Sequence, residues 1–101
     1  SPAADIINAV RSKGADVKAF DPVAMDEAKH CIDGIEFATD EYDAIEGADA
    51  LIIVTEWNQF RALDMQRVKK LLKQPKIADL RNIYEPSDMR EMGFEYVGVG
   101  R

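Results

Sequence analysis

Two short segments carry polar and aromatic side chains directly after apolar runs, where such residues could bind a ligand. The first is Thr-Glu-Trp-Asn-Gln-Phe-Arg at residues 55–61, which follows the apolar run 50–55. The second is Asp-Leu-Arg-Asn-Ile-Tyr at residues 79–84, which follows the run 76–80. Open parallel sheets bind ligands at the carboxyl ends of their strands. We therefore expect both segments to contribute to a binding site.

Arg81 is the sharpest candidate within these segments. Its guanidinium presents a planar fork of hydrogen-bond donors that suits phosphate or ribose oxygens. The alternative is an ion pair with Asp79 or Glu85, which lie close in the sequence. Arg81 is therefore predicted to bind an anionic ligand unless one of these carboxylates occupies it.

Thr55, Glu56 and Trp57 are the other candidate contact residues, and the last two have structural alternatives. Glu56 suits acid–base chemistry or ligand binding, but it also suits capping backbone N–H groups at the start of the following turn. Trp57, together with Phe60, suits ligand contact or simple coverage of the end of the sheet. The residues alone leave both possibilities open.

The usual catalytic and metal-binding patterns are absent from the sequence. The six glycines do not form a G-x-G-x-x-G loop after a strand. His30 and Cys31 are neighbours, so on a helix their side chains point about 100° apart, and one His with one Cys gives no metal-ligand spacing. We therefore predict no catalytic residue, no cofactor-binding residue and no metal ligand in this chain.

The charge balance excludes several classes of partner. With a net charge of −6, the chain has no basic stripe for nucleic acid and is poorly suited to an anionic membrane surface. A basic cluster at residues 67–73 is interleaved with apolar residues, as on a helix with one solvent-exposed face and one buried face.

The single cysteine cannot form an internal disulfide, and no signal peptide or transmembrane run is visible. These features predict a cytoplasmic location.

The predicted elements alternate between helices and strands along the whole chain. Residues 50–55 form the strongest strand, because a continuous apolar run is typical of a parallel strand covered on both faces. Apolar spacing, Pro and Gly positions indicate the other elements. The expected helices cover residues 2–13, 22–29, 40–45, 65–72 and 86–92, and the expected strands cover 15–20, 35–37, 50–55, 76–80 and 94–99.

This order predicts one α/β domain over residues 1–101, with helices on both faces of a mostly parallel, doubly wound sheet. Such domains normally open with a buried strand, whereas here a helix comes first. We therefore expect the first, central strand to be missing from this chain, between 15–20 and 50–55. Its loss removes roughly 5–10 kcal/mol of a typical stability of about 5–15 kcal/mol. The 101 residues alone are not expected to form a stable monomer.

The strand-end segments, with further motifs, resemble the C-terminal UDP-binding domain of the UDP-glucose 6-dehydrogenases. Supporting motifs occur in the right order across the chain: Gly-Ala-x-Val-x-Ala-Phe-Asp-Pro at 14–22, Tyr-Asp-Ala at 42–44, Gly-Ala-Asp-Ala at 47–50, Gly-Phe-x-Tyr at 93–96, and Val-Gly-Arg at 99–101. The resemblance implies a Rossmann-like fold. Ser1-Pro2 resembles the end of the family's T-D-D-x-R-x-S-P segment, so the upstream substrate- and cofactor-contacting residues are expected to lie outside this chain.

The resemblance also implies the activity of the intact enzyme. Family members oxidise UDP-glucose to UDP-glucuronate in two NAD-dependent steps at C6 of the sugar. The catalytic Cys, Lys and Asn, and the domain that holds most of the NAD, belong to parts outside this chain, and Cys31 does not match the catalytic Cys. A fragment of this kind is expected to be inactive alone, and the intact enzyme to be a homodimer or a higher oligomer.

For individual residues, the resemblance implies a substrate-side site without catalytic groups. Arg81 matches the Arg of the family's D-G-R-N segment, which reaches the UDP ribose region, although Leu80 replaces the usual Gly. Thr55, Glu56 and Trp57 match a signature near the nucleotide crevice. The alternatives are a related dehydrogenase of GDP-mannose or a UDP-amino sugar, or a nucleotide-binding module without catalysis.

Overall fold

The structure is a computed structural model that describes residues 2–20, 35–56 and 58–99. The chain divides into two compact units, Ser1–Ala44 and Ile45–Arg101. The helix expected over 22–29, the His30–Cys31 pair, Trp57 and the last two residues lie outside the described residues. Each unit is described by itself below.

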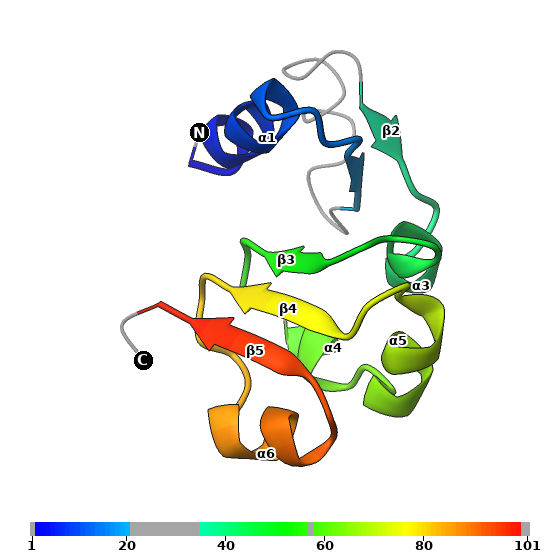
Figure 1. The fold of residues 1–101 in the computed structure, drawn as a ribbon, viewed down its shortest axis with the longest axis vertical. Coiled ribbons are helices and arrows are strands. Elements are labelled where there is room, and N and C mark those ends of the chain that lie inside the picture. The colour runs from blue at the N-terminus through cyan, green and yellow to red at the C-terminus, as the bar shows by residue number, and fades with distance from the viewer. Residues whose placement is uncertain (1, 21–34, 57, 100–101) are drawn as a thin grey trace. The chain divides into compact units, whose positions relative to one another are not determined.

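The first unit contains one helix and a short parallel strand pair (Figure 1). Helix α1 (Pro2–Ser12) forms as expected and is followed by Gly14, whose φ of 93° is readily adopted only by glycine. Strands β1 (Lys18–Ala19) and β2 (Glu36–Phe37) pair in parallel, with Lys18 opposite Glu36. The strand expected over 15–20 is thus shorter than predicted, because it forms strand hydrogen bonds only where the two-residue β2 lies opposite it.

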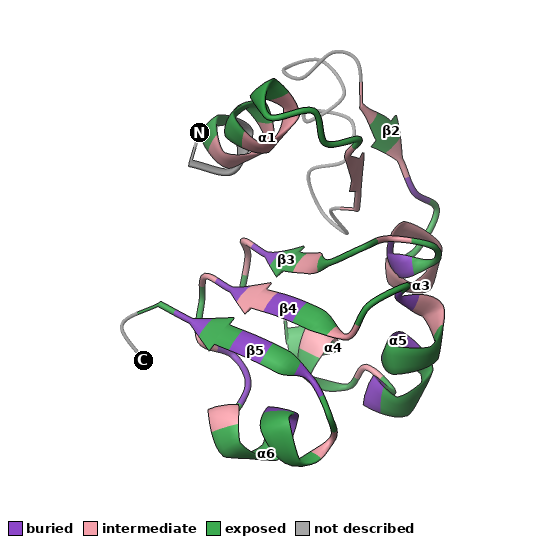
Figure 2. Ribbon diagram, viewed as in Figure 1, coloured by how far each residue is buried: buried purple, intermediate pink, exposed green. Residues whose placement is uncertain are grey.

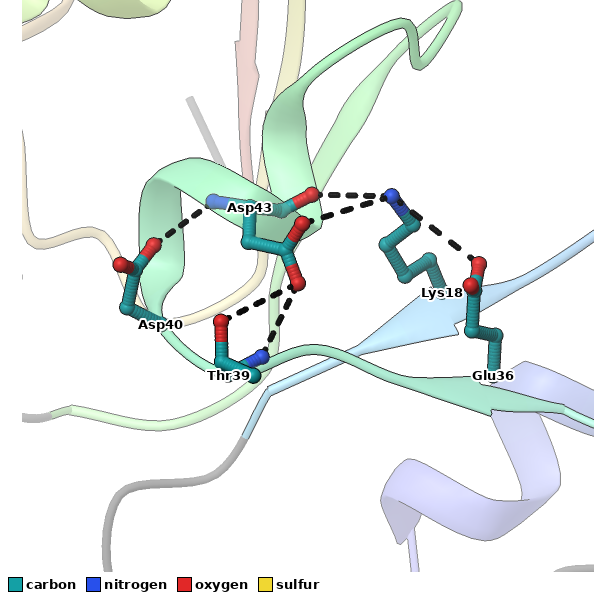
Figure 3. A network of polar contacts seen from close by, with 5 residues as sticks. All are labelled: Lys18, Glu36, Thr39, Asp40 and Asp43. Atoms are coloured by element: carbon teal, nitrogen blue, oxygen red, sulfur yellow. Dashed lines mark hydrogen bonds and ion pairs between the residues drawn. The ribbon is translucent and has the colours of Figure 1, made fainter.

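A polar network follows β2 and organises the start of helix α3 (Glu41–Ile45). Figure 3 shows Lys18 between two carboxylates, with its Nζ 3.9 Å from Glu36 Oε2 and 4.0 Å from Asp43 Oδ1. Asp43 Oδ2 accepts hydrogen bonds from the backbone N–H of Thr39 (3.0 Å) and from its hydroxyl (3.4 Å). Asp40 in turn accepts from the N–H of Asp43 at 2.7 Å, which caps the helix.

The second unit contains a three-stranded parallel sheet in the order β3–β4–β5. The strands are β3 (Leu51–Ile53), β4 (Lys76–Asp79) and β5 (Glu95–Gly98). In their register, Ile53 lies opposite Asp79, which lies opposite Gly98. All three strands were expected at these places, and each is shorter than its expected range.

Three helices of the second unit connect its strands: α4 (Asn58–Arg61), α5 (Met65–Leu71) and α6 (Pro86–Glu91). Asp64 caps α5, since its Oδ1 accepts from the N–H groups of Gln66 (3.1 Å) and Arg67 (3.3 Å). Pro86 occupies the first turn of α6, as predicted. The short helix α4 was not predicted, because residues 55–61 read as a polar turn rather than as a helix.

One face of the three-stranded sheet forms the core of the second unit. Ile53, Ile77 and Tyr96 are buried on this face, and Val68 of α5 and Met89 of α6 are buried as well (Figure 2). The opposite face carries Ile52, Ala78 and Val97 in one row, of which Ile52 and Val97 are exposed. Figure 1 shows α4, α5 and α6 together on one side of the sheet.

The α/β class and the parallel pairing predicted from the sequence are confirmed. The described strands form two sheets, of two and three strands, instead of the single sheet that was expected. Among the helices of the described residues, none has the length and apolar character that a membrane span requires.

Candidate functional site

The fold brings the two strand-end segments together, as the sequence predicted. Strands β3 and β4 are parallel neighbours, so both segments leave the same edge of the sheet. The Leu80 N–H donates to the carbonyl oxygen of Ile53 at 2.9 Å. The hydroxyl of Tyr84 donates to the carbonyl oxygen of Phe60. The described residues of 55–61 and residues 79–84 therefore lie side by side at this edge of the sheet and form the candidate site.

Arg81 lies at this edge and contacts Glu56 of the other segment. Its Nη2 is 3.5 Å from Oε1 of Glu56, and each of the two side chains is 51% exposed. The ion pair therefore joins the two segments, whereas the sequence analysis considered Asp79 and Glu85 as partners. About half of the Arg81 side chain is exposed, and a guanidinium carries five N–H donors, so the single contact with Glu56 leaves donors for an anionic ligand.

Thr55 and Glu56 follow the end of β3, and Glu56 contacts Arg81. Thr55 is half-buried and Glu56 is exposed. The contact described for the Glu56 carboxylate is the one with Arg81, and α4 begins two residues later at Asn58. Trp57, the remaining predicted contact residue, lies outside the described residues. Phe60 is half-buried and contributes its backbone oxygen to the link with Tyr84.

Asp79 is the residue of this site whose importance the sequence analysis missed. It is fully buried, with an exposure of 0%, and its carboxylate accepts four hydrogen bonds. The N–H groups of Arg81, Ile83 and Tyr84 supply three of them, at 3.0, 2.8 and 3.1 Å. The fourth comes from the Tyr96 hydroxyl of β5 at 2.6 Å.

The turn that Asp79 organises has an unusual backbone. Asn82 has a φ of 55°, in the left-handed region that Asn tolerates better than most side chains. Its Nδ2 donates to the carbonyl oxygen of Val99 at 2.9 Å. An Asp at a strand end followed three residues later by Asn was the signal for such a turn, since both types favour local bonds to the backbone.

The described residues offer no reactive constellation at this edge. They contain no group of three or more His, Cys, Asp or Glu side chains that could hold a metal ion. The described turns after β3 and β4 also lack the glycine-rich loop that cradles a dinucleotide pyrophosphate. The arrangement suits binding of a polar, anionic ligand.

Comparison with known proteins agrees with this geometry. The family described as "UDP-glucose/GDP-mannose dehydrogenase family, UDP binding domain" matches residues 1–86. The UDP-glucose 6-dehydrogenase of Rhizobium meliloti is 46% identical over 101 residues, covering 100% of this chain and 23% of that protein. The UDP-glucose 6-dehydrogenase TuaD of Bacillus subtilis is 41% identical (100% and 22%), and the Pseudomonas aeruginosa enzyme 40% (100% and 24%). The chain thus spans about a quarter of the length of these relatives.

Proposed function

The chain belongs to the UDP-glucose/GDP-mannose dehydrogenase family as its UDP-binding domain, and on this premise we propose that it holds the UDP part of UDP-glucose. The observation that carries the proposal is the meeting of Arg81 and Glu56 from two different strand ends at one edge of the sheet. A nucleotide at this edge would reach donors and acceptors from both segments. Three relatives named UDP-glucose 6-dehydrogenase favour UDP-glucose over GDP-mannose.

We propose that the complete protein oxidises UDP-glucose to UDP-glucuronate. Each of two steps passes a hydride from C6 of the sugar to NAD⁺, and one water molecule supplies the second carboxylate oxygen. No redox step is assigned to the residues of this chain, because its described turns after β3 and β4 carry no glycine-rich dinucleotide loop. The NAD-binding domain of the same enzyme is the proposed partner of this domain, in a homodimer or a higher oligomer.

Arg81 is proposed as the main nucleotide contact. Its exposed guanidinium donates to ribose or phosphate oxygens, and charge-assisted bonds of this kind are roughly twice as strong as neutral ones. Glu56, which follows the end of the neighbouring strand β3, contacts the guanidinium at 3.5 Å. Thr55 and Trp57 are proposed to contact the same nucleotide, as neighbours of Glu56 in the sequence.

Substitution of Arg81 tests this proposal. In the complete protein, Arg81→Ala is expected to raise KM for UDP-glucose and Kd for UDP about 10- to 100-fold, because charged hydrogen bonds to the ligand are lost. The kcat is expected to change much less, since Arg81 is not placed at the reacting carbon. Steady-state kinetics and calorimetric titration with UDP measure the two effects.

A matched control separates this effect from a general loss of positive charge. Lys70→Ala removes a positive charge from the exposed side of α5 and is expected to leave both constants unchanged. An unchanged KM and Kd in Arg81→Ala would contradict the assignment of Arg81. Turnover of GDP-mannose but not of UDP-glucose by the unmodified protein would reject the proposed substrate.

A further inference from the structure

The buried carboxylate of Asp79 has no part in the proposed ligand contacts, although it lies directly beneath them. Asp79 ends β4, two residues before Arg81, and has no solvent exposure. A carboxylate out of reach of solvent cannot bind the nucleotide or exchange protons with it. Its function must therefore act through the residues that it touches.

The two carboxylate oxygens of Asp79 accept hydrogen bonds from different residues of the turn. Oδ1 accepts the N–H of Arg81 at 3.0 Å. Oδ2 accepts the N–H groups of Ile83 and Tyr84 at 2.8 and 3.1 Å, and the hydroxyl of Tyr96 at 2.6 Å. One side chain thus fixes the backbone on both sides of the left-handed residue Asn82 and ties it to β5.

This arrangement determines where the Arg81 side chain leaves the backbone. The Leu80 N–H is held by the carbonyl of Ile53 at 2.9 Å, and the Arg81 N–H is held by Asp79. With two consecutive N–H groups fixed, the Arg81 Cα has little freedom. Its guanidinium then needs only its own torsions to reach Glu56, 3.5 Å away.

We propose that Asp79 is the positioning residue for Arg81, so that the buried carboxylate sets the affinity of the site for UDP without touching it. This inference rests on the proposed function, because it requires Arg81 to bind the nucleotide. A group misplaced by about 1 Å can lose most of its contribution, which gives a positioning residue a large effect on affinity.

The substitution Asp79→Asn probes this role with almost no change in volume. An amide has one acceptor oxygen and one NH₂ group. If the oxygen takes the place of Oδ2 and keeps its three donors, the NH₂ group faces the N–H of Arg81, and two donors oppose each other. The substitution therefore disturbs the backbone of Arg81 more than the rest of the turn.

A double-mutant cycle in the complete protein tests the proposal, with UDP binding measured by calorimetry. Asp79→Asn is expected to weaken UDP binding about tenfold in the wild-type background, and to raise KM for UDP-glucose with little change in kcat. In the Arg81→Ala background, the same substitution is expected to change Kd less than about twofold, because residues that act through each other are not additive.

Two further variants serve as a control for lost stability and as a substitute for Asp79→Asn. Val68→Ala shortens a fully buried side chain of α5 and is expected to lower stability while leaving the Kd for UDP unchanged. Should Asp79→Asn fail to fold, Tyr96→Phe keeps the carboxylate and removes one donor. It is expected to weaken UDP binding about two- to threefold with Arg81 present, and not at all in Arg81→Ala.

The outcomes separate this inference from the function on which it rests. An equal loss of affinity from Asp79→Asn in both backgrounds would overturn the positioning role, while the effect of Arg81→Ala itself would still support the nucleotide site. A loss of affinity in Val68→Ala as large as in Asp79→Asn would also overturn it. An unchanged Kd in Arg81→Ala alone would overturn the contact assigned to Arg81 and the positioning role together.

Discussion

Two aspartates, one in each unit, organise a turn with a carboxylate, but they do so in opposite surroundings. Asp43 accepts from Thr39 and lies 4.0 Å from the ammonium of Lys18, and its side chain is 45% exposed. Asp79 accepts from three backbone N–H groups and a tyrosine hydroxyl, and it is fully buried. The donors are similar in kind, whereas the access of water is not.

The difference shows how burial sets the importance of a polar network. Around Asp43, water replaces any contact that is lost, and an exposed ion pair contributes little. Around Asp79, water does not reach the N–H groups of the buried residues Ile83 and Tyr84. Loss of the carboxylate therefore leaves these N–H groups without its hydrogen bonds. Buried hydrogen-bond networks therefore specify one backbone conformation, while exposed ones adjust.

Removing the buried carboxylate is expected to have the largest effect. Asp79→Ala should lower the free energy of unfolding by about 3–5 kcal/mol, because three backbone N–H groups and the Tyr96 hydroxyl lose the buried carboxylate as an acceptor. Urea denaturation of the complete protein, followed by circular dichroism, measures this loss. A loss below about 1 kcal/mol would mean that water enters the turn and that the two aspartates do not differ in kind.

Removing a single donor from the buried network is expected to have an intermediate effect. Tyr96→Phe deletes the hydroxyl that lies 2.6 Å from Asp79 Oδ2 and keeps the ring in the core. We expect a loss of about 1.5–3 kcal/mol in the same denaturation assay, the usual contribution of a hydrogen bond to a charged group. A loss equal to that of Asp79→Ala would place the stabilisation in the hydroxyl rather than in the carboxylate.

The exposed network is expected to show the smallest effect. Lys18→Met keeps most of the aliphatic stem and removes the contacts of Nζ with Glu36 and Asp43. The free energy of unfolding should fall by less than about 1 kcal/mol, and the difference should shrink further at high salt. A salt-independent loss as large as that of Tyr96→Phe would show that exposure does not separate the two networks.

The sequence predicted which two segments lie side by side better than it predicted the contacts between them. The rule that parallel strands share a carboxyl edge was enough to bring residues 55–61 and 79–84 together. Local signals also sufficed for the helices expected over 65–72 and 86–92, which form as α5 and α6. Each of these features depends on a pattern within a few residues of the chain.

The connections that were missed depend on the register between strands. Glu56 and Arg81 are 25 residues apart, and Asp79 and Tyr96 are 17 apart, so no local pattern pairs them. The partners suggested for Arg81 were its neighbours in sequence, because sequence alone gives no measure of distance across a sheet. Helix α4 was missed because its four residues are too short for a helical period to show.

The hydrogen bonds to Asp79 also limit how fast the backbone amides of the turn after β4 exchange their protons with solvent. A backbone N–H exchanges its proton with solvent only when its hydrogen bond opens. The amides of Arg81, Ile83 and Tyr84 are bonded to a fully buried acceptor, so they should open only together with the sheet. In deuterated water this irregular turn should therefore retain its protons about as long as strand β4, and the ligand meets a backbone that is already ordered.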